Sequence, residues 1–358
     1  MKERNSKIEF LRMLSMFMIV IWHATGHGGV LEACKADGGL TYYIIDFIKI
    51  VTIPATNIFV IISGYFLVES HFKIKKLVLL WLEVFFYSVL LYFLTALLGT
   101  TELSLIGIIR AICPVSFGQG YWFIKTYMGM FVFSPFFNIA IQNMNKKTHI
   151  LLLAIMIVLF AVVTSIPEMN TLNSEGQHSI LWFTVLYFTG AYLKKYPVQL
   201  KKSMALLGAL AMYLFIFVSE IVLEKISYSF GFEGRGTGLF TMYNTLPVFL
   251  AAVFIFLACS GQDFSGKFLR MAILSLSGST FAIYLIHDNM YLRPQLWQFM
   301  SITRFKDSAF LPIILLAAGI LIYSVCIVID KLTWTPLSRL FKKIDFSHLQ
   351  AKIDSFLG

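Results

Sequence analysis

Ionisable side chains lie in the first long apolar segment of the sequence, where charge is costly. The stretch IEFLRMLSMFMIVIWHATGHGG begins at Ile8 and carries Glu9, Arg12 and His23. In an α-helix, positions 12 and 23 are separated by three turns plus about 20°, so both fall on one stripe, about 16 Å apart along the axis. Ionisable groups in spans normally face the bundle interior or a wet cavity. The stripe therefore predicts a polar channel along this helix, in which an imidazole can act as a general base.

Each of these residues also has a simpler interpretation. Arg12 can extend its charged end to the inner lipid headgroups, with Glu9 as its ion-pair partner. His23 can be a structural, hydrogen-bonded histidine. His27, one turn later at the outer end, is interpreted as solvent-facing polarity rather than a second participant. The catalytic candidates are His23, Arg12 and Glu9.

The composition indicates that transmembrane helices position these residues. Of the 358 residues, 58% are hydrophobic and only 13% are charged, whereas a soluble domain averages ~25% charged residues. A span needs about 20 apolar residues, and ten segments are candidates. They lie near 8–27, 42–68, 75–98, 121–141, 149–166, 179–195, 203–224, 240–260, 271–290 and 310–330.

Basic residues are concentrated in loops that alternate along the chain, as the positive-inside rule requires. The basic loops and ends lie at 2–7, 73–76, 145–147, 194–202, 267–270 and 331–343. They predict an all-α polytopic membrane protein of about ten transmembrane helices, with both termini in the cytoplasm. The formal net charge of +10 is thus a topology signal, and no basic face remains for nucleic acid.

Three segments depart from a simple row of spans. The segment 42–68 is overlong and contains Pro54, which predicts a tilt or a kink. Residues 104–120 are too short and too interrupted to span, and we expect an interfacial or re-entrant segment on the outer side. Residues 336–358 alternate apolar and basic side chains at helical spacing. We expect a cytoplasmic amphipathic tail there, after a single transmembrane domain at 1–335.

The four cysteines predict neither a metal site nor a disulfide framework. Cys34, Cys113, Cys259 and Cys326 show no CxxC spacing. The N-terminus begins with basic residues, but no small-residue cleavage signal follows the first apolar run, so we expect a retained helix rather than a signal peptide.

Four segments, in register along the chain, resemble the acyltransferase-3 family of integral membrane acyltransferases. The first is IEFLRMLSMFMIVIWH, with the family's arginine, ten residues and histidine, and an acid three residues before the arginine. The others are NIFVIISGYFL at 57–67, YWFIKTYMGMFVFSPFFN at 121–138 and STFAIYLIH at 279–287. The resemblance covers nearly the whole chain.

The resemblance implies an acyl transfer at the bacterial plasma membrane. Family members move acyl groups, usually acetyl from cytoplasmic acetyl-CoA, to a hydroxyl of a surface polysaccharide or lipid-linked glycan. The chain resembles the stand-alone branch, which has no fused extracytoplasmic domain. The resemblance implies no bound cofactor, because the acyl-CoA is the donor substrate. The polysaccharide-synthesis machinery is a further expected partner.

Roles for the charged residues follow from the resemblance. His23 would take the proton of the acceptor hydroxyl, and burial favours the uncharged imidazole that this role needs; a covalent acyl-histidine relay stays open. Arg12 would hold the donor or stabilise charge. Lys73, Lys75 and Lys76 would bind the anionic head of acyl-CoA. Many relatives carry arginines in this loop, and lysine cannot bind phosphate bidentately, so KIKK can also be only a topology signal.

Substrate-binding candidates lie on the second, fourth and ninth predicted spans. They are Asn57, Ser63, Tyr121, Trp122, Lys125, Tyr284 and His287. Polar residues such as Asn57 often only join helices, and aromatics such as Trp122 often only anchor at the interface. His287, on one helix face with Tyr284, would bind the acceptor or orient the surroundings of His23.

Two other functions fit the same sequence. A transporter or flippase that exports glycan without acyl transfer would also use a polar, aromatic-lined cavity. A passive subunit of a polysaccharide assembly would leave the ionisable stripe unexplained.

Overall fold

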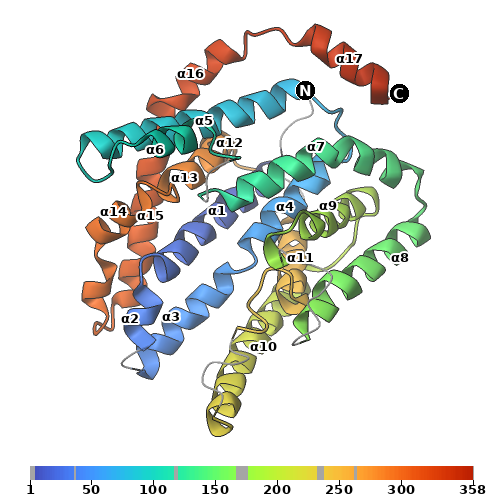
Figure 1. The fold of residues 1–358 in the computed structure, drawn as a ribbon. Coiled ribbons are helices and arrows are strands. Elements are labelled where there is room, and N and C mark those ends of the chain that lie inside the picture. Colours follow the sequence, from blue (N-terminus) through green and yellow to red (C-terminus); the bar gives the residue numbers. More distant parts are fainter. Residues whose placement is uncertain are drawn as a thin grey trace.

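The computed structural model is a bundle of helices (Figure 1). It describes residues 5–35, 38–116, 120–166, 176–231, 238–261 and 264–357. These residues contain no β-strand. Each of the ten predicted spans is helical. The corresponding helices are α1 (Ser6–Gly26), α3 (Gly39–Thr52) with α4 (Ala55–Leu67), α5 (Ile74–Leu97), α7 (Trp122–Asn143), α8 (Lys146–Ile157), α9 (Ile180–Lys195), α10 (Lys202–Ser229), α11 (Leu246–Cys259), α12 (Lys267–Leu276) with α13 (Thr280–His287), and α15 (Leu311–Leu332).

The lengths of these helices confirm an all-helical, multi-pass membrane protein. Eight helical segments among the described residues are long and apolar enough to cross a bilayer. Helices α9 and α11 have 16 and 14 residues, which gives about 24 and 21 Å at 1.5 Å per residue. Both are shorter than the ~30 Å of a hydrocarbon core. The expectation of ten full spans therefore stays a prediction for these two helices.

The overlong second segment is broken where the sequence predicts it. Helix α3 ends at Thr52, and α4 begins at Ala55 after a turn at Ile53 and Pro54. Proline has no backbone N–H and cannot continue the helical ladder of α3, but its fixed φ suits the start of α4. The ninth segment is also divided, because a 3-10 turn at Ser277–Ser279 separates α12 from α13.

Helix α9 is largely buried and packs closely against α4. The close approach depends on two glycines. A Cβ at Gly64 would overlap the carbonyl oxygen of Tyr187, and a Cβ at Gly190 would overlap that of Ile61 and lie 2.7 Å from Tyr65 N. Small residues at helix crossings allow such contact in membranes. This crossing fixes α4, whose other face lies against α1.

We expect Gly190→Ala to destabilise the bundle, because the added methyl group meets backbone atoms that cannot move without separating α4 from α9. Overpacking of this kind costs about 1–3 kcal/mol or more. The melting temperature of the detergent-purified protein should fall. Gly278→Ala is the matched control, since a Cβ there has no neighbour within 4 Å. Equal melting temperatures for the two variants would contradict a tight crossing.

The basic loops gather at one end of the bundle. Lys194 pairs with Glu69 at 3.6 Å, Lys195 Nζ donates to Met144 O at 2.8 Å, and Lys75 Nζ donates to Lys342 O at 2.6 Å. The loops after α4, α7, α9 and α15 therefore meet, as the positive-inside prediction requires. That this end faces the cytoplasm stays a prediction.

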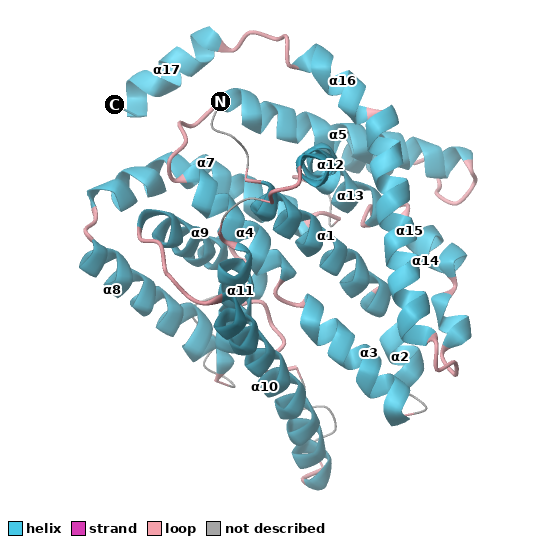
Figure 2. Cartoon of the chain, turned by 180° about the vertical axis from the view of Figure 1, so that it is seen from behind, coloured by secondary structure: helices cyan, strands magenta, loops and turns pink. Residues whose placement is uncertain are grey.

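The C-terminal tail forms two helices. Helices α16 (Trp334–Phe341) and α17 (Ser347–Leu357) run along the end of the bundle that carries the basic loops (Figures 1 and 2). Gln350 ties α17 to the start of α5: its Oε1 accepts from Ile74 N at 3.0 Å and its Nε2 donates to Phe72 O at 2.9 Å.

The segment 104–120 does not span. Its helix α6 (Leu105–Ile112) has eight residues, and Leu105, Ile106 and Ile109 are exposed along one side. Gly107 on the other side packs against the ring of Tyr92. An amphipathic helix of this length fits the interfacial prediction. Residues 117–119 lie outside the described part of the chain.

Candidate active site

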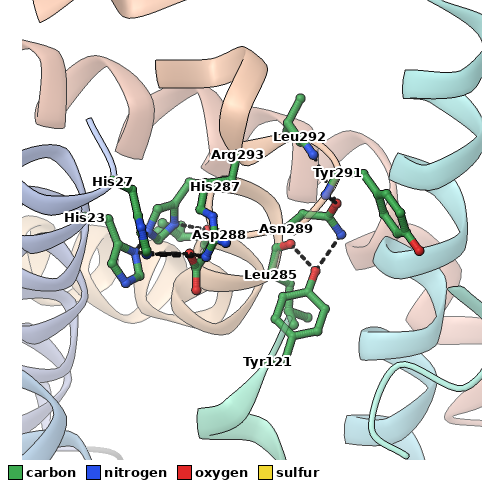
Figure 3. A network of polar contacts seen from close by, with 11 residues as sticks. His23, His27, Tyr121, Leu285, His287, Asp288, Asn289, Tyr291, Leu292 and Arg293 are labelled. Atoms are coloured by element: carbon green, nitrogen blue, oxygen red, sulfur yellow. Dashed lines mark hydrogen bonds and ion pairs between the residues drawn. The ribbon is translucent and has the colours of Figure 1, made fainter. Parts of the chain in front are cut away.

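Helices α1 and α13 bring two buried histidines together. His23 lies in the last turn of α1, and His287 is the last residue of α13. His23 Nδ1 lies 2.9 Å from His287 Nε2 (Figure 3). Both spans are apolar around these positions, so each imidazole must find its hydrogen-bond partner inside the protein.

The backbone of α13 fixes the proton positions in this pair. His287 Nδ1 lies 2.6 Å from Ile283 O, and a carbonyl only accepts, so Nδ1 carries the proton. In a neutral imidazole, His287 Nε2 then accepts, and the proton of the shared bond belongs to His23 Nδ1. His23 Nε2 is left with a free lone pair and makes no hydrogen bond to another described residue. This tautomer is the one that a general base requires.

A charged layer lies beside the two histidines, at the end of the bundle opposite the basic loops. Arg293 Nη1 donates to Asp288 Oδ1 at 3.1 Å and to His27 Nε2 at 3.3 Å. Asp288 is buried, and its Oδ1 also lies 3.7 Å from His23 Nδ1. Arg293 belongs to α14 (Arg293–Met300), which directly follows α13 in the chain. His27 is exposed, as expected, but it also contacts this network.

Three residues of this network could ligate a metal ion, but the guanidinium of Arg293 already lies among them. Ligand atoms of His23, His27 and Asp288 lie within 4.8 Å of one another. The Arg293 guanidinium, however, contacts two of the three residues. A divalent ion would have to displace this positive charge, so the arrangement favours a histidine held by an ion pair over a metal centre.

A narrow cavity lies beside His23. Its volume is about 20 Å³, which is room for about one water molecule. Met16, Ile19 and His23 line it along α1, on the stripe that also contains Arg12. Most of the other walls are aromatic: Trp22, Phe59, Trp122, Phe123, Tyr243 and Tyr284. The cavity therefore follows the predicted stripe from the imidazole of His23 toward the N-terminal end of α1.

Glu9 and Arg12 lie at the other end of α1, away from the histidine pair. Arg12 Nη1 pairs with Glu9 Oε2 at 3.0 Å, and neither residue lines the cavity. The ion pair that the sequence offered as the simpler interpretation is present. The structure places the two residues on the predicted stripe but does not bring them together with His23, and their catalytic role stays a prediction.

Asn57 and Ser63 on α4 hold helices together. Asn57 Nδ2 donates to Tyr243 O at 2.6 Å, and its Oδ1 accepts from Trp182 Nε1 at 3.0 Å. Ser63 Oγ contacts Phe59 O and the hydroxyl of Tyr127. Neither residue lines the cavity. Asn57 fixes Tyr243, which does line it.

The candidates on α7 and α13 divide into two groups. Trp122 and Tyr284 line the cavity, whereas Lys125 is exposed and lies outside its walls. Tyr121 fixes the end of α13: its hydroxyl donates to Leu285 O at 2.7 Å and accepts from Asn289 Nδ2 at 2.8 Å (Figure 3). Tyr121 therefore helps to hold His287 in place.

The predicted donor lysines lie beside the C-terminal tail. Lys75 Nζ donates to two tail carbonyls, those of Lys342 and Ile344. Lys73 and Lys75 line a surface cleft of about 330 Å³ together with α17, while Lys76 is exposed. Binding of an acyl-CoA head here stays a prediction.

The structure adds residues that the sequence reading did not select. Arg293, Asn289 and Tyr243 all contact the site or its supports. The sequence could have indicated Arg293 and Asn289. Both lie in HDNMYLR at 287–293, a short polar connection that follows a span and must stay near its end. Tyr243 carried no such signal.

Comparison with known proteins identifies the family. A family model described as an acyltransferase domain, Acyl_transf_3, matches residues 5–331. The chain belongs to the acyltransferase-3 family. It is therefore a membrane acyltransferase, as the resemblance implied. Neither a curated protein nor a solved structure matches the chain significantly. The matched range of this acyltransferase contains the histidine pair and Arg293, and it ends before α16.

We expect Arg293→Gln to lower the stability of this acyltransferase, because it leaves the buried Asp288 carboxylate without its guanidinium. The cost should be about 1–3 kcal/mol, since the Arg293 side chain is 30% exposed. Thermal unfolding in detergent measures it. Arg304→Gln, at an exposed arginine, is the control. If both variants unfold at the same temperature, the ion pair of Asp288 with Arg293 does not contribute to stability.

Proposed function

We propose that this membrane acyltransferase moves an acyl group, acetyl being the expected one, from cytoplasmic acyl-CoA to a hydroxyl of a surface polysaccharide or lipid-linked glycan. The membrane is the bacterial plasma membrane, and His23 is the general base. The observation that carries the proposal is the fixed chain from His23 Nδ1 through His287 to Ile283 O, which leaves His23 Nε2 free to accept a proton.

The chemistry needs one base and no bound cofactor. The acceptor hydroxyl gives its proton to His23 Nε2 while its oxygen attacks the thioester carbonyl carbon. The tetrahedral intermediate expels the thiolate of coenzyme A, and the imidazolium returns the proton to that sulfur. An ester and free coenzyme A result. The Asp288 carboxylate, 3.7 Å from His23 Nδ1, stabilises the transient imidazolium.

The arrangement along α1 supports a reaction between two compartments. His23 lies at the end of the bundle opposite the basic loops, and the cavity extends from it toward Arg12. A long, flexible thioester arm could follow this stripe while its anionic head stays near Arg12 and Lys73, Lys75 and Lys76. The aromatic walls suit the apolar face of a sugar. A cavity of about 20 Å³ must widen to admit either substrate.

The test combines gene removal with an assay of isolated membranes. Membranes that contain the protein should transfer label from acetyl-labelled acetyl-CoA to glycan, and the surface polysaccharide of a deletion strain should lose the mass of its acetyl groups. Longer acyl-CoA donors identify the acyl group. A polysaccharide that disappears from the surface while its acylation is unchanged would support the transporter or flippase instead.

A further inference from the structure

A second pocket adjoins the histidine cavity. It has a volume of about 170 Å³ and lies where the end of α1 meets α2 (Val30–Lys35) and α3. Its walls are Trp22, Thr25, Gly26, Leu31, Glu32 and Lys49. Trp22 also lines the cavity beside His23, so the indole is a wall common to both spaces. We call this space the Trp22–Lys49 pocket.

We propose that the Trp22–Lys49 pocket binds a neutral sugar or amino sugar of the acceptor glycan. The proposal deepens the acyl transfer proposed above and rests on it. Because the cavity beside His23 has room for about one water, an acceptor must first be held elsewhere. Movement of the Trp22 side chain would join the pocket to His23.

Lys49 has hydrogen-bonding capacity that the protein does not use fully. Its Nζ lies 3.5 Å from Asp46 Oδ1 and 3.9 Å from Glu220 Oε1. Both distances exceed the roughly 2.7–2.9 Å of a charge-assisted hydrogen bond. An ammonium has three donors, and this side chain is only 19% exposed. A ligand hydroxyl in the pocket would satisfy it.

The other polar and aromatic groups of the region complement a sugar. Glu32 contributes an exposed carboxylate, which accepts hydrogen bonds from hydroxyl groups. Next to Lys49, Glu220 Oε2 is buried without a hydrogen-bond partner in the described structure. The Trp22 ring, 5.9 Å from Lys49 Nζ, offers an apolar surface. Hydroxyl groups both donate and accept hydrogen bonds. A ligand that carries them therefore suits these groups better than a purely apolar ligand does.

The charge around the pocket selects against anionic ligands. Glu32 and Lys49 line the pocket, and two further acids, Asp46 and Glu220, lie within 4 Å of Lys49. The excess of negative charge repels a phosphate or a uronic acid and tolerates a neutral or protonated amino sugar. The pocket therefore fits the sugar part of a glycan rather than a lipid phosphate.

The experiment separates acceptor binding from donor chemistry. Lys49→Met and Glu32→Gln are assayed for acetyl transfer to glycan in membranes. The purified proteins are also assayed without glycan for hydrolysis of acetyl-CoA, in which water accepts the acetyl group and free thiol is released. Transfer should fall about tenfold or more, as expected for loss of a hydrogen bond to a charged group. Thiol release should stay within about twofold of the wild type. Lys306→Met and Glu102→Gln, at residues outside the pocket walls, are the matched controls.

A binding measurement tests the pocket without any turnover. Tryptophan fluorescence of the purified wild type should respond to glucose and glucosamine but not to glucuronic acid, and Lys49→Met should lose the response. Because Lys49→Met leaves Asp46 and Glu220 without their cation, Glu32→Gln provides a second variant at an exposed position.

Three results would overturn the pocket: unchanged transfer in both variants, an equal loss of transfer and thiol release, or a glucuronic acid response as strong as that of glucose. A wild type that neither releases thiol nor acetylates glycan would overturn the proposed function instead, and the sugar titration would still decide whether the pocket binds sugar.

Discussion

Replacing His23 with glutamine is expected to lower acetyl transfer to glycan by about 10²–10⁴-fold, the usual contribution of a positioned general base. Glutamine can still donate a hydrogen bond toward His287 Nε2, so the packing of α1 against α13 should persist. It has no basic nitrogen to take the proton of the acceptor hydroxyl. The loss should therefore appear in the rate of transfer by isolated membranes, normalised to the amount of folded protein.

His149→Gln is the control for removing a buried imidazole. His149 on α8 is fully buried, and its Nε2 contacts Phe188 O at 3.1 Å. It lies outside the cavity and the histidine network. If His23→Gln and His149→Gln retained the same transfer rate, His23 would be a structural histidine and the proposed mechanism would be wrong.

Replacing His287 with leucine is expected to lower the transfer rate by about 10²-fold. His287 acts on the reaction through His23: its Nε2 accepts the Nδ1 proton and so keeps the lone pair on His23 Nε2. Without this acceptor, His23 can adopt the other tautomer. In a serine protease, the wrong histidine tautomer lowers kcat by up to about 10⁴-fold. Leucine still fills the buried space but removes the acceptor.

The His287 variants distinguish a positioning residue from a merely structural one. His287→Gln offers an amide oxygen near the position of Nε2 and should recover most of the rate that His287→Leu loses. The apparent KM for acetyl-CoA should stay the same in both, because His287 does not meet the donor. A loss that is equal in the two variants, or that follows the melting temperature, would contradict the role in tautomer selection.

Much of the fold could be predicted because each span is a local feature. A run of about 20 apolar residues must be helical in a bilayer, since every backbone group has to be satisfied within its own segment. The break at Pro54 is equally local, because proline alone removes the donor and fixes φ. The gathering of basic loops at one end also follows from the order of the segments along the chain.

Whether α9 and α11 cross the whole bilayer could not be predicted in the same way. Their apolar runs satisfy the composition of a span, but the helices have only 16 and 14 residues. Helix α9 is surrounded by other helices, with Gly64 and Gly190 at its crossing with α4. An apolar run does not reveal whether its neighbours will be lipid or protein.

The candidate site was partly predictable for the same reason. The spacing of Arg12 and His23 placed them on one helix face, and the motif STFAIYLIH selected His287. Which of the polar residues meet His23 depends on contacts between segments more than 250 positions apart. Arg293 reaches His27, and Asn57 is used by Trp182 and Tyr243 rather than by the cavity.

By itself, the sequence determined the apolar spans, their breaks and the helical stripe of α1, because hydrophobic length and helix periodicity act over short distances along the chain. The tertiary structure alone decided that His287 faces His23, that Arg293 neutralises Asp288 and that Trp22 separates two spaces. These pairings depend on how α1, α3 and α13 pack, and packing is set by the shapes of side chains that are distant in the sequence.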